Sequence, residues 1–208
     1  MTSMLIWGVA TVLYILFLSR YYNWSGAIKA EEVEGIIQKL SASTGMQYTD
    51  VDTFRTFLEQ DDGKEFIMQN FVKLRRGEVV HPSTGQPISP RKLLNEYFRP
   101  FVKELIKRGG HPLSMSAKVG GYIDSWEAEE DPAWDAVAMM RYRCRRDIAE
   151  LVMDGRFSEI HGFKHLAIEK TVSFPVQMNT QLIMKPGVYV PIMLLLLASL
   201  GQIATGFV

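Results

Sequence analysis

The sequence contains a single cysteine, Cys144, and no excess of either charge. One cysteine builds no intramolecular disulfide, so a disulfide-stapled secreted miniprotein is excluded. The 23 Lys and Arg residues balance the 23 Asp and Glu residues, which excludes a strongly basic nucleic-acid binder. A hydrophobic share of 47% also excludes a disordered chain.

The common catalytic motifs are missing as well. The sequence has no GxSxG elbow, no Walker loop, no GxGxxG turn and no CxxC pair. A serine hydrolase, an NTPase, a Rossmann dehydrogenase and a thioredoxin-like redox protein are therefore not indicated.

Neither end of the sequence carries a charged side chain, because every Lys, Arg, Asp and Glu lies within residues 20–185. As a helix, residues 1–19 would span about 28 Å, close to the roughly 30 Å of a bilayer's hydrocarbon core. Aromatic residues follow this run as an interfacial girdle. The pattern predicts a transmembrane helix in residues 1–24, with a cleaved signal peptide as the competing interpretation. No Lys or Arg precedes the apolar run and no small-x-small site closes it, which favours an uncleaved anchor.

The C-terminal segment, residues 179–208, is the second predicted transmembrane helix. From Pro186 onward it has no charge and no polar stripe, which is typical of a lipid-facing helix and not of a helix on the surface of a globular protein. A buried core helix is the alternative interpretation. Ala198 and Gly201 are small residues that favour close packing against another helix.

Two spans place both termini on one side of the membrane and the middle domain on the other. Arg20, Lys29 and Lys185 flank the spans on the domain side, while the outer ends have no Lys or Arg. The positive-inside rule therefore predicts a cytoplasmic domain. An unpaired cysteine is compatible with that reducing compartment, and the sequon at Asn23 is interpreted as chance.

The middle of the chain changes from a helical to a mixed pattern. Residues 25–64 predict a helical arm, with Asp50 as the N-cap of its second helix. Residues 65–178 then predict a βαββαβ order with a loop between residues 77 and 90. The predicted strands are 66–74, 112–123, 134–142 and 171–177, and the predicted helices are 90–106 and 145–170, the latter interrupted near Asp154. The fold class is therefore α+β, a ferredoxin-like domain flanked by two transmembrane helices. Its uncovered sheet face needs a partner, for which a second copy is the simplest choice.

An ordered series of motifs in residues 65–178 resembles domain-of-unknown-function family 1330, in the dimeric α/β-barrel superfamily. The residues that carry the resemblance are Asn70, the Gly109-Gly110 pair, Trp134-Asp135, the run from Arg141 to Arg146, and Phe157, His161, Ala167 and Glu169. The resemblance implies a ferredoxin-like protomer that dimerises through its sheet. It supplies a fold and little chemistry, because the family has no settled reaction.

A ligand pocket between sheet and helices is the first candidate site, and the resemblance implies its position. The residues that would line it are Asn70, Tyr97, His111, Trp134 and Tyr142. Aromatic residues on strands are more often core residues, which is the alternative interpretation.

Two further candidates depend on charged or metal-ligating side chains. His161 and His165 lie one helical turn apart and form a possible metal-ligand pair, although such pairs recur without metal. Arg141 and Arg143, placed on one sheet face by alternation, form a possible anion site. The alternative for these arginines is a set of ion pairs with nearby carboxylates.

Cys144 is a lone thiol beside three arginines, which would lower its pKa and make it reactive. A structural cysteine is the default interpretation.

No catalytic pattern stands out, while two spans, a helical arm and an open sheet favour association. We therefore expect a non-catalytic accessory or assembly subunit of a larger membrane protein complex. Its expected partners are membrane lipid and either other subunits or a second copy of itself; no nucleic acid is expected and no cofactor is indicated. The alternative is a dimeric α/β-barrel enzyme or binding protein for a lipophilic small molecule, since that superfamily includes cofactor-free oxygenases and haem-handling proteins. A simple homodimeric tether is a third possibility.

Overall fold

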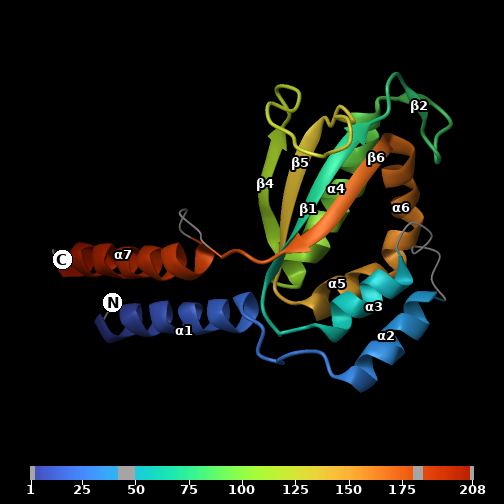
Figure 1. Ribbon diagram of the computed structural model, residues 1–208. Helices are drawn as coiled ribbons and strands as arrows, with labels where there is room; N and C mark the ends of the chain where they lie inside the picture. Colours follow the sequence, from blue (N-terminus) through green and yellow to red (C-terminus); the bar gives the residue numbers. More distant parts are fainter. Residues whose placement is uncertain (1–2, 42–49, 180–184, 207–208) are drawn as a thin grey trace. The chain divides into compact units, whose positions relative to one another are not determined.

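The computed structural model describes residues 3–41, 50–179 and 185–206. The chain forms two compact units (Figure 1). Unit 1 combines the two ends of the chain, Met1–Trp24 and Met178–Val208, and unit 2 is the continuous segment Ser25–Gln177.

Unit 1 consists of two helices that are long and apolar enough to cross a membrane, α1 (Ser3–Tyr21) and α7 (Pro186–Gly206). They pack side by side, with Gly201 of α7 facing Ile6 of α1. The side-chain amide oxygen of Gln202 accepts hydrogen bonds from Ser3 Oγ at 2.9 Å and from Trp7 Nε1 at 2.6 Å. Most of the apolar side chains on both helices remain exposed.

Unit 2 begins with the predicted helical arm, whose helices are α2 (Ala30–Ser41) and α3 (Val51–Glu59). The predicted cap is confirmed, because the Asp50 carboxylate accepts hydrogen bonds from the backbone N–H groups of Asp52 and Thr53. The apolar side of the arm packs on Ala149 in a core cluster of its own. The other buried members of that cluster are Ile28, Val33, Ile37 and Leu58. The sequence also predicts that Ser43, Thr44 and Gly45 end the first helix of the arm, and these three lie outside the described residues.

The rest of unit 2 is the predicted ferredoxin-like domain, and the α+β fold class is confirmed. Four antiparallel strands form one sheet in the order β4-β5-β1-β6. The strands are β1 (Phe66–Leu74), β4 (His111–Ala117), β5 (Ala136–Tyr142) and β6 (Ile168–Val176). One helix, α4 (Pro90–Lys107), joins β1 to β4, and two helices, α5 (Arg145–Met153) and α6 (Gly155–Ala167), join β5 to β6.

Two predicted elements extended too far, and one predicted loop contains a hairpin. The predicted strand 112–123 ends at Ala117, because the chain turns away before the Gly120-Gly121 pair and Lys118 closes a loop onto Asp135. The predicted helix 145–170 ends at Ala167, since Ile168 already pairs with Leu74 as the first residue of β6. The predicted loop 77–90 contains a small hairpin of β2 (Val79–Val80) and β3 (Pro87–Ile88).

Strand alternation divides the sheet into a helix-covered face and an open face. Phe66, Met140 and Tyr142 point to the covered face and pack against α4 and α5 in the main core cluster. Figure 1 shows α4 and α6 on the same side of the sheet. Residues of the opposite parity form the other face, which we call the open face. Its apolar members include Ile67 and Phe71 of β1, Val137 and Met139 of β5, and Val172, Phe174 and Val176 of β6.

Candidate functional site

The five residues of the predicted pocket do not converge on one cavity. Tyr97 and Tyr142 lie in the core under the helices, whereas Trp134 contacts Phe71 on the open face, with ring centroids 6.0 Å apart. His111 begins β4 opposite Arg141, which has open-face parity. Asn70 bonds across the sheet, donating from Nδ2 to Ala138 O and accepting from Ser173 Oγ. Tyr97 lies on a helix and Trp134 precedes β5, so their separation comes from tertiary packing, which spacing along the sequence does not show.

A cluster of Tyr97, Tyr142 and His161 lies between the sheet and α6. The Tyr142 ring stacks on Phe66 with centroids 5.0 Å apart, and the Tyr97 ring meets His161 edge-on at 5.7 Å. Burial raises the pKa of both tyrosines, so both phenols stay protonated. The cluster therefore presents neutral hydroxyl groups in an apolar setting.

His161 and His165 lie together on α6, with ring centroids 5.0 Å apart. Burial, reinforced by the positive charges of Lys164 and His165, lowers the pKa of His161 to about 4. Burial lowers the pKa of His165 as well. A neutral imidazole is the form that ligates a metal, but the described residues contain no group of three His, Cys, Asp or Glu side chains able to hold one. The structure thus provides two imidazoles of the predicted metal pair and no third ligand among the residues it describes.

The depressed pKa of His161 predicts acid sensitivity. Between pH 6.5 and about 4 the unfolded chain binds a proton at this position that the folded chain does not, so stability is full above pH 6.5 and falls toward pH 4. With allowance for solvent screening, we expect a loss of about 2 kcal/mol over that range. His161→Phe keeps the edge contact with Tyr97 and removes the titration. Thermal unfolding of the detergent-solubilised chain at stepped pH values tests this; an unchanged pH slope in the variant would contradict it.

His81 and Glu96 form a polar contact that the sequence reasoning missed. The His81 ring is buried, and its Nε2 atom lies 2.9 Å from Glu96 Oε2. Its Nδ1 atom accepts hydrogen bonds from the backbone N–H groups of Ser83 and Thr84. Its ring also packs on Phe163 of α6. Because both ring nitrogens are engaged, His81 holds the β2–β3 hairpin against α4 and α6. The only sequence signal was the turn-forming run His-Pro-Ser-Thr-Gly after a short apolar pair.

The arginines of the predicted anion site contact carboxylates of the same unit. Arg141 is buried and binds Glu65 through Nε and Nη2, at 2.9 and 2.5 Å, and donates to Gly109 O. Arg143 lies beyond the end of β5 and not on a sheet face, and it binds Asp147 at 2.7 and 3.0 Å. The neighbouring pairs are Arg145 with Asp61 and Arg146 with Glu32. The alternative interpretation, a set of ion pairs, describes this geometry.

The structure agrees with the default interpretation of Cys144 as a structural cysteine, and not with a reactive thiol. The side chain is buried at the start of α5, and burial raises its pKa to about 11. The charge of Arg143 lowers this pKa less than burial raises it, and the negative charge of Asp147, the partner of Arg143, raises it further. A thiol that stays protonated is a poor nucleophile, so Cys144 is structural.

The open face of the sheet is an apolar surface of unit 2. Phe71 and Phe174 stack with centroids 5.9 Å apart, and Trp134 extends the aromatic surface beside Phe71. Val172 and Phe174 stay exposed, although both are large and apolar. Charged groups border this surface: Lys73 pairs with Glu169 at 2.7 Å, and Lys170 lies 6.0 Å from the Trp134 ring. An apolar centre with a charged border is the anatomy of a protein interface.

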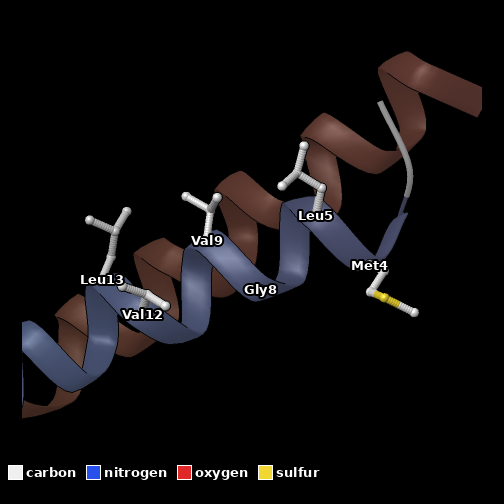
Figure 2. Close-up of a pocket in the computed structure, with 6 residues that line it drawn as sticks. All are labelled: Met4, Leu5, Gly8, Val9, Val12 and Leu13. Carbon is white, nitrogen blue, oxygen red and sulfur yellow. The ribbon is translucent and has the colours of Figure 1, made fainter.

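Unit 1 offers a shallow groove on the outer side of α1. Figure 2 shows it around Gly8, where the missing side chain leaves a notch between Leu5 and Val9. Met4, Val12 and Leu13 complete the lining, which contains only hydrocarbon and sulfur groups. The groove can accommodate an acyl chain or another apolar helix but has no side chain for acid–base chemistry.

Comparisons with known proteins give solved structures of similar fold and do not indicate a function. No protein-family model matches the chain, and no curated protein matches it. The solved structure of RPA0582, a protein of unknown function from Rhodopseudomonas palustris, is similar, with 18% identity and a TM-score of 0.51. The match covers 62% of this chain and 94% of that one. A structure of methylated RPA0582 is similar too, with 20% identity, a TM-score of 0.51, and 65% and 93% of the two chains covered. At this identity the likeness shows the fold alone.

Proposed function

We propose that this chain is a non-catalytic, membrane-anchored accessory or assembly subunit of a larger membrane protein complex. The observation that carries the proposal is the open face, where Phe71, Phe174 and Trp134 form an apolar surface with a charged border. Such a surface is stable in water when a partner covers it. The buried side chains of Arg141 and Asp61, by contrast, are used in internal bonds, with Glu65 and with the Ile28 backbone N–H.

Unit 1 supports the membrane location. Its two helices leave large apolar side chains about half exposed along their length, which lipid would cover. The hydrogen bonds from Ser3 and Trp7 to Gln202 join the two ends of the chain, and polar contacts of this kind hold helices together in a membrane. This pairing favours a retained N-terminal anchor over a cleaved signal peptide. The positive charges of Arg20, Lys29 and Lys185 favour a cytoplasmic domain.

The occupant of the open face is either a second copy of the chain or another subunit. The ferredoxin-like sheet is the fold that the resemblance to domain-of-unknown-function family 1330 implies, and the same resemblance implies a sheet-to-sheet dimer. The packed pair of helices α1 and α7 adds a second association surface inside the membrane. One span is enough for tethering, so two spans that pack together favour a role in assembly.

Gentle detergent extraction from native membranes tests the proposal. We expect size-exclusion chromatography and mass spectrometry of the eluting peak to show this chain with stoichiometric larger subunits. Elution alone, as a monomer or an empty dimer, would contradict the accessory role. A dimer that is alone and empty would instead support a simple tether.

A second candidate function is a dimeric α/β-barrel enzyme or binding protein for a lipophilic small molecule. The observation that favours it is the neutral His161 beside the protonated phenols of Tyr97 and Tyr142. A neutral imidazole beside neutral phenols suits an uncharged ligand, because these groups form hydrogen bonds in an apolar setting without adding a charge. The same chromatographic peak distinguishes this candidate, because an absorbing or extractable organic molecule bound to the chain would support it.

A further inference from the structure

The loop at residues 118–135, which joins β4 to β5, presents large apolar side chains to solvent. Val119 and Ile123 are fully exposed and Trp126 is 88% exposed. Figure 1 shows the loop as the yellow-green segment between the two strands. Tryptophan is among the residues most enriched at the energetic centre of protein interfaces, so an exposed one on a structured loop indicates a contact.

The base of the loop is held by a set of polar contacts. The backbone N–H of Lys118 donates to Asp135 O at 3.0 Å, and the Asp135 carboxylate accepts the Leu74 N–H at 2.7 Å. The Lys118 ammonium pairs with Asp131, and this contact lowers the pKa of the Asp131 carboxyl. Trp134 Nε1 donates to the Tyr122 hydroxyl at 3.3 Å. These contacts shape the loop and join it, through Trp134, to the open face.

The loop is also strongly acidic. Residues 119–135 contain no Lys or Arg. Two of the loop's carboxylates are paired, Asp131 with Lys118 and Asp135 with Arg76. Among the residues that the structure describes, the others form no ion pair. These are Asp124, Glu127, Glu129 and Glu130. The exposed apolar side chains therefore stand among uncompensated negative charges.

The loop lies at the end of the sheet away from the point where the chain leaves unit 2. Ile67 pairs with Val176, next to the exit at Gln177, whereas Val72 pairs with Ala136 next to the loop. The five residue-to-residue steps from Ile67 to Val72 separate the two ends by about 17 Å of strand. A negative loop is also repelled by anionic lipid headgroups. Charge therefore favours a protein over a bilayer as the occupant.

We propose that loop 118–135 docks into a protein partner that offers an apolar pocket bordered by Lys or Arg side chains. The inference rests on the proposed function, since the partner is another subunit of the same complex. Trp126 and Ile123 fill the pocket, and the carboxylates around them pair with its basic border. The partner's surface is therefore complementary to the loop in both shape and charge.

Site-specific photo-crosslinking in native membranes tests the proposal with the full chain. Benzoylphenylalanine replaces Trp126 in one variant and Val80, another exposed apolar residue, on β2, in the control. We expect the residue 126 probe to yield an adduct to a different protein, with Lys or Arg beside apolar residues in the crosslinked peptide. An adduct to lipid, an adduct to a second copy, no adduct, or the same adduct from the control would overturn the proposal.

Two substitution variants measure the contribution of each part of the loop. Trp126→Ala is expected to lower the recovery of the partner at least tenfold. Neutralising Asp124, Glu127, Glu129 and Glu130 to their amides is expected to remove the salt dependence of the association. If the wild-type chain elutes alone, the proposed function fails; if the complex persists unchanged with Trp126→Ala, only the docking loop is disproved.

Discussion

Phe174→Glu is expected to release the chain from its partner while leaving unit 2 folded. Phe174 lies on the open face beside Phe71 and is 42% exposed in the isolated chain. In a covered interface the new carboxylate would be desolvated with no positive partner, which costs several kcal/mol. We expect association to weaken by at least about 100-fold, measured as loss of co-elution after detergent extraction. The fold loses only the ring contact with Phe71, worth about 1 kcal/mol.

Ile106→Glu is the matched control for this change. Ile106 is also large, apolar and exposed, at 55%, but it lies on α4 and not on the sheet. The control adds the same charge to a different surface, and we expect the complex to survive it. If Phe174→Glu retains the partner, or if both variants lose it equally, the open face is not the docking surface.

Asp61→Ala is expected to detach the helical arm from the domain and to destabilise unit 2 by about 3 kcal/mol. The Asp61 side chain is 1% exposed and accepts hydrogen bonds from the backbone N–H groups of Ile28 at 2.8 Å and Gly63 at 3.1 Å. It also lies 3.6 Å from Arg145 Nε. Arg145 itself donates to Phe57 O and lies over the Phe57 ring. Removing the carboxylate leaves a largely buried guanidinium without its counter-charge and two N–H groups without an acceptor.

Asp62→Ala controls for the loss of one acidic residue at the same point in the chain. The Asp62 carboxylate is partly exposed and bonds the side chain of Gln177, so its loss should cost about 0.5 kcal/mol or less. Urea unfolding of the detergent-solubilised chain, followed by tryptophan fluorescence, measures both variants. Equal midpoints for the two would show that Asp61 does not hold the arm.

Local features of this protein were readable from the sequence because their causes are local. The two ends of the chain without charged residues predicted the two long apolar helices, since length and composition decide whether a helix can cross a membrane. Asp50 caps α3 and Pro90 begins α4, because a cap and a first-turn proline act within a few residues. The βαββαβ order followed from the sequence of apolar patterns, and so did the α+β class.

The candidate site was beyond what the sequence shows, because it depends on which strands pair and in which register. Trp134 precedes β5 and packs on Phe71, whereas Tyr97 lies on α4 in the core, although both are aromatic and both were expected in one pocket. Arg141 binds Glu65, which lies 76 residues away in the chain, and no periodic pattern in the sequence predicts that pair. Burial raised the pKa of Cys144, where sequence neighbours alone predicted a fall.

The sequence by itself determined the two apolar helices, the helical arm and the order of strands and helices, because hydrophobic patterning and capping are properties of short segments. Only the tertiary structure decided which residues meet. The order β4-β5-β1-β6 placed Phe71 against Phe174 on a face left uncovered, and it set the acidic loop at the end of the sheet away from Gln177. Such contacts join residues far apart in the chain, and their energy comes from burial and pairing that exist only after the sheet has formed.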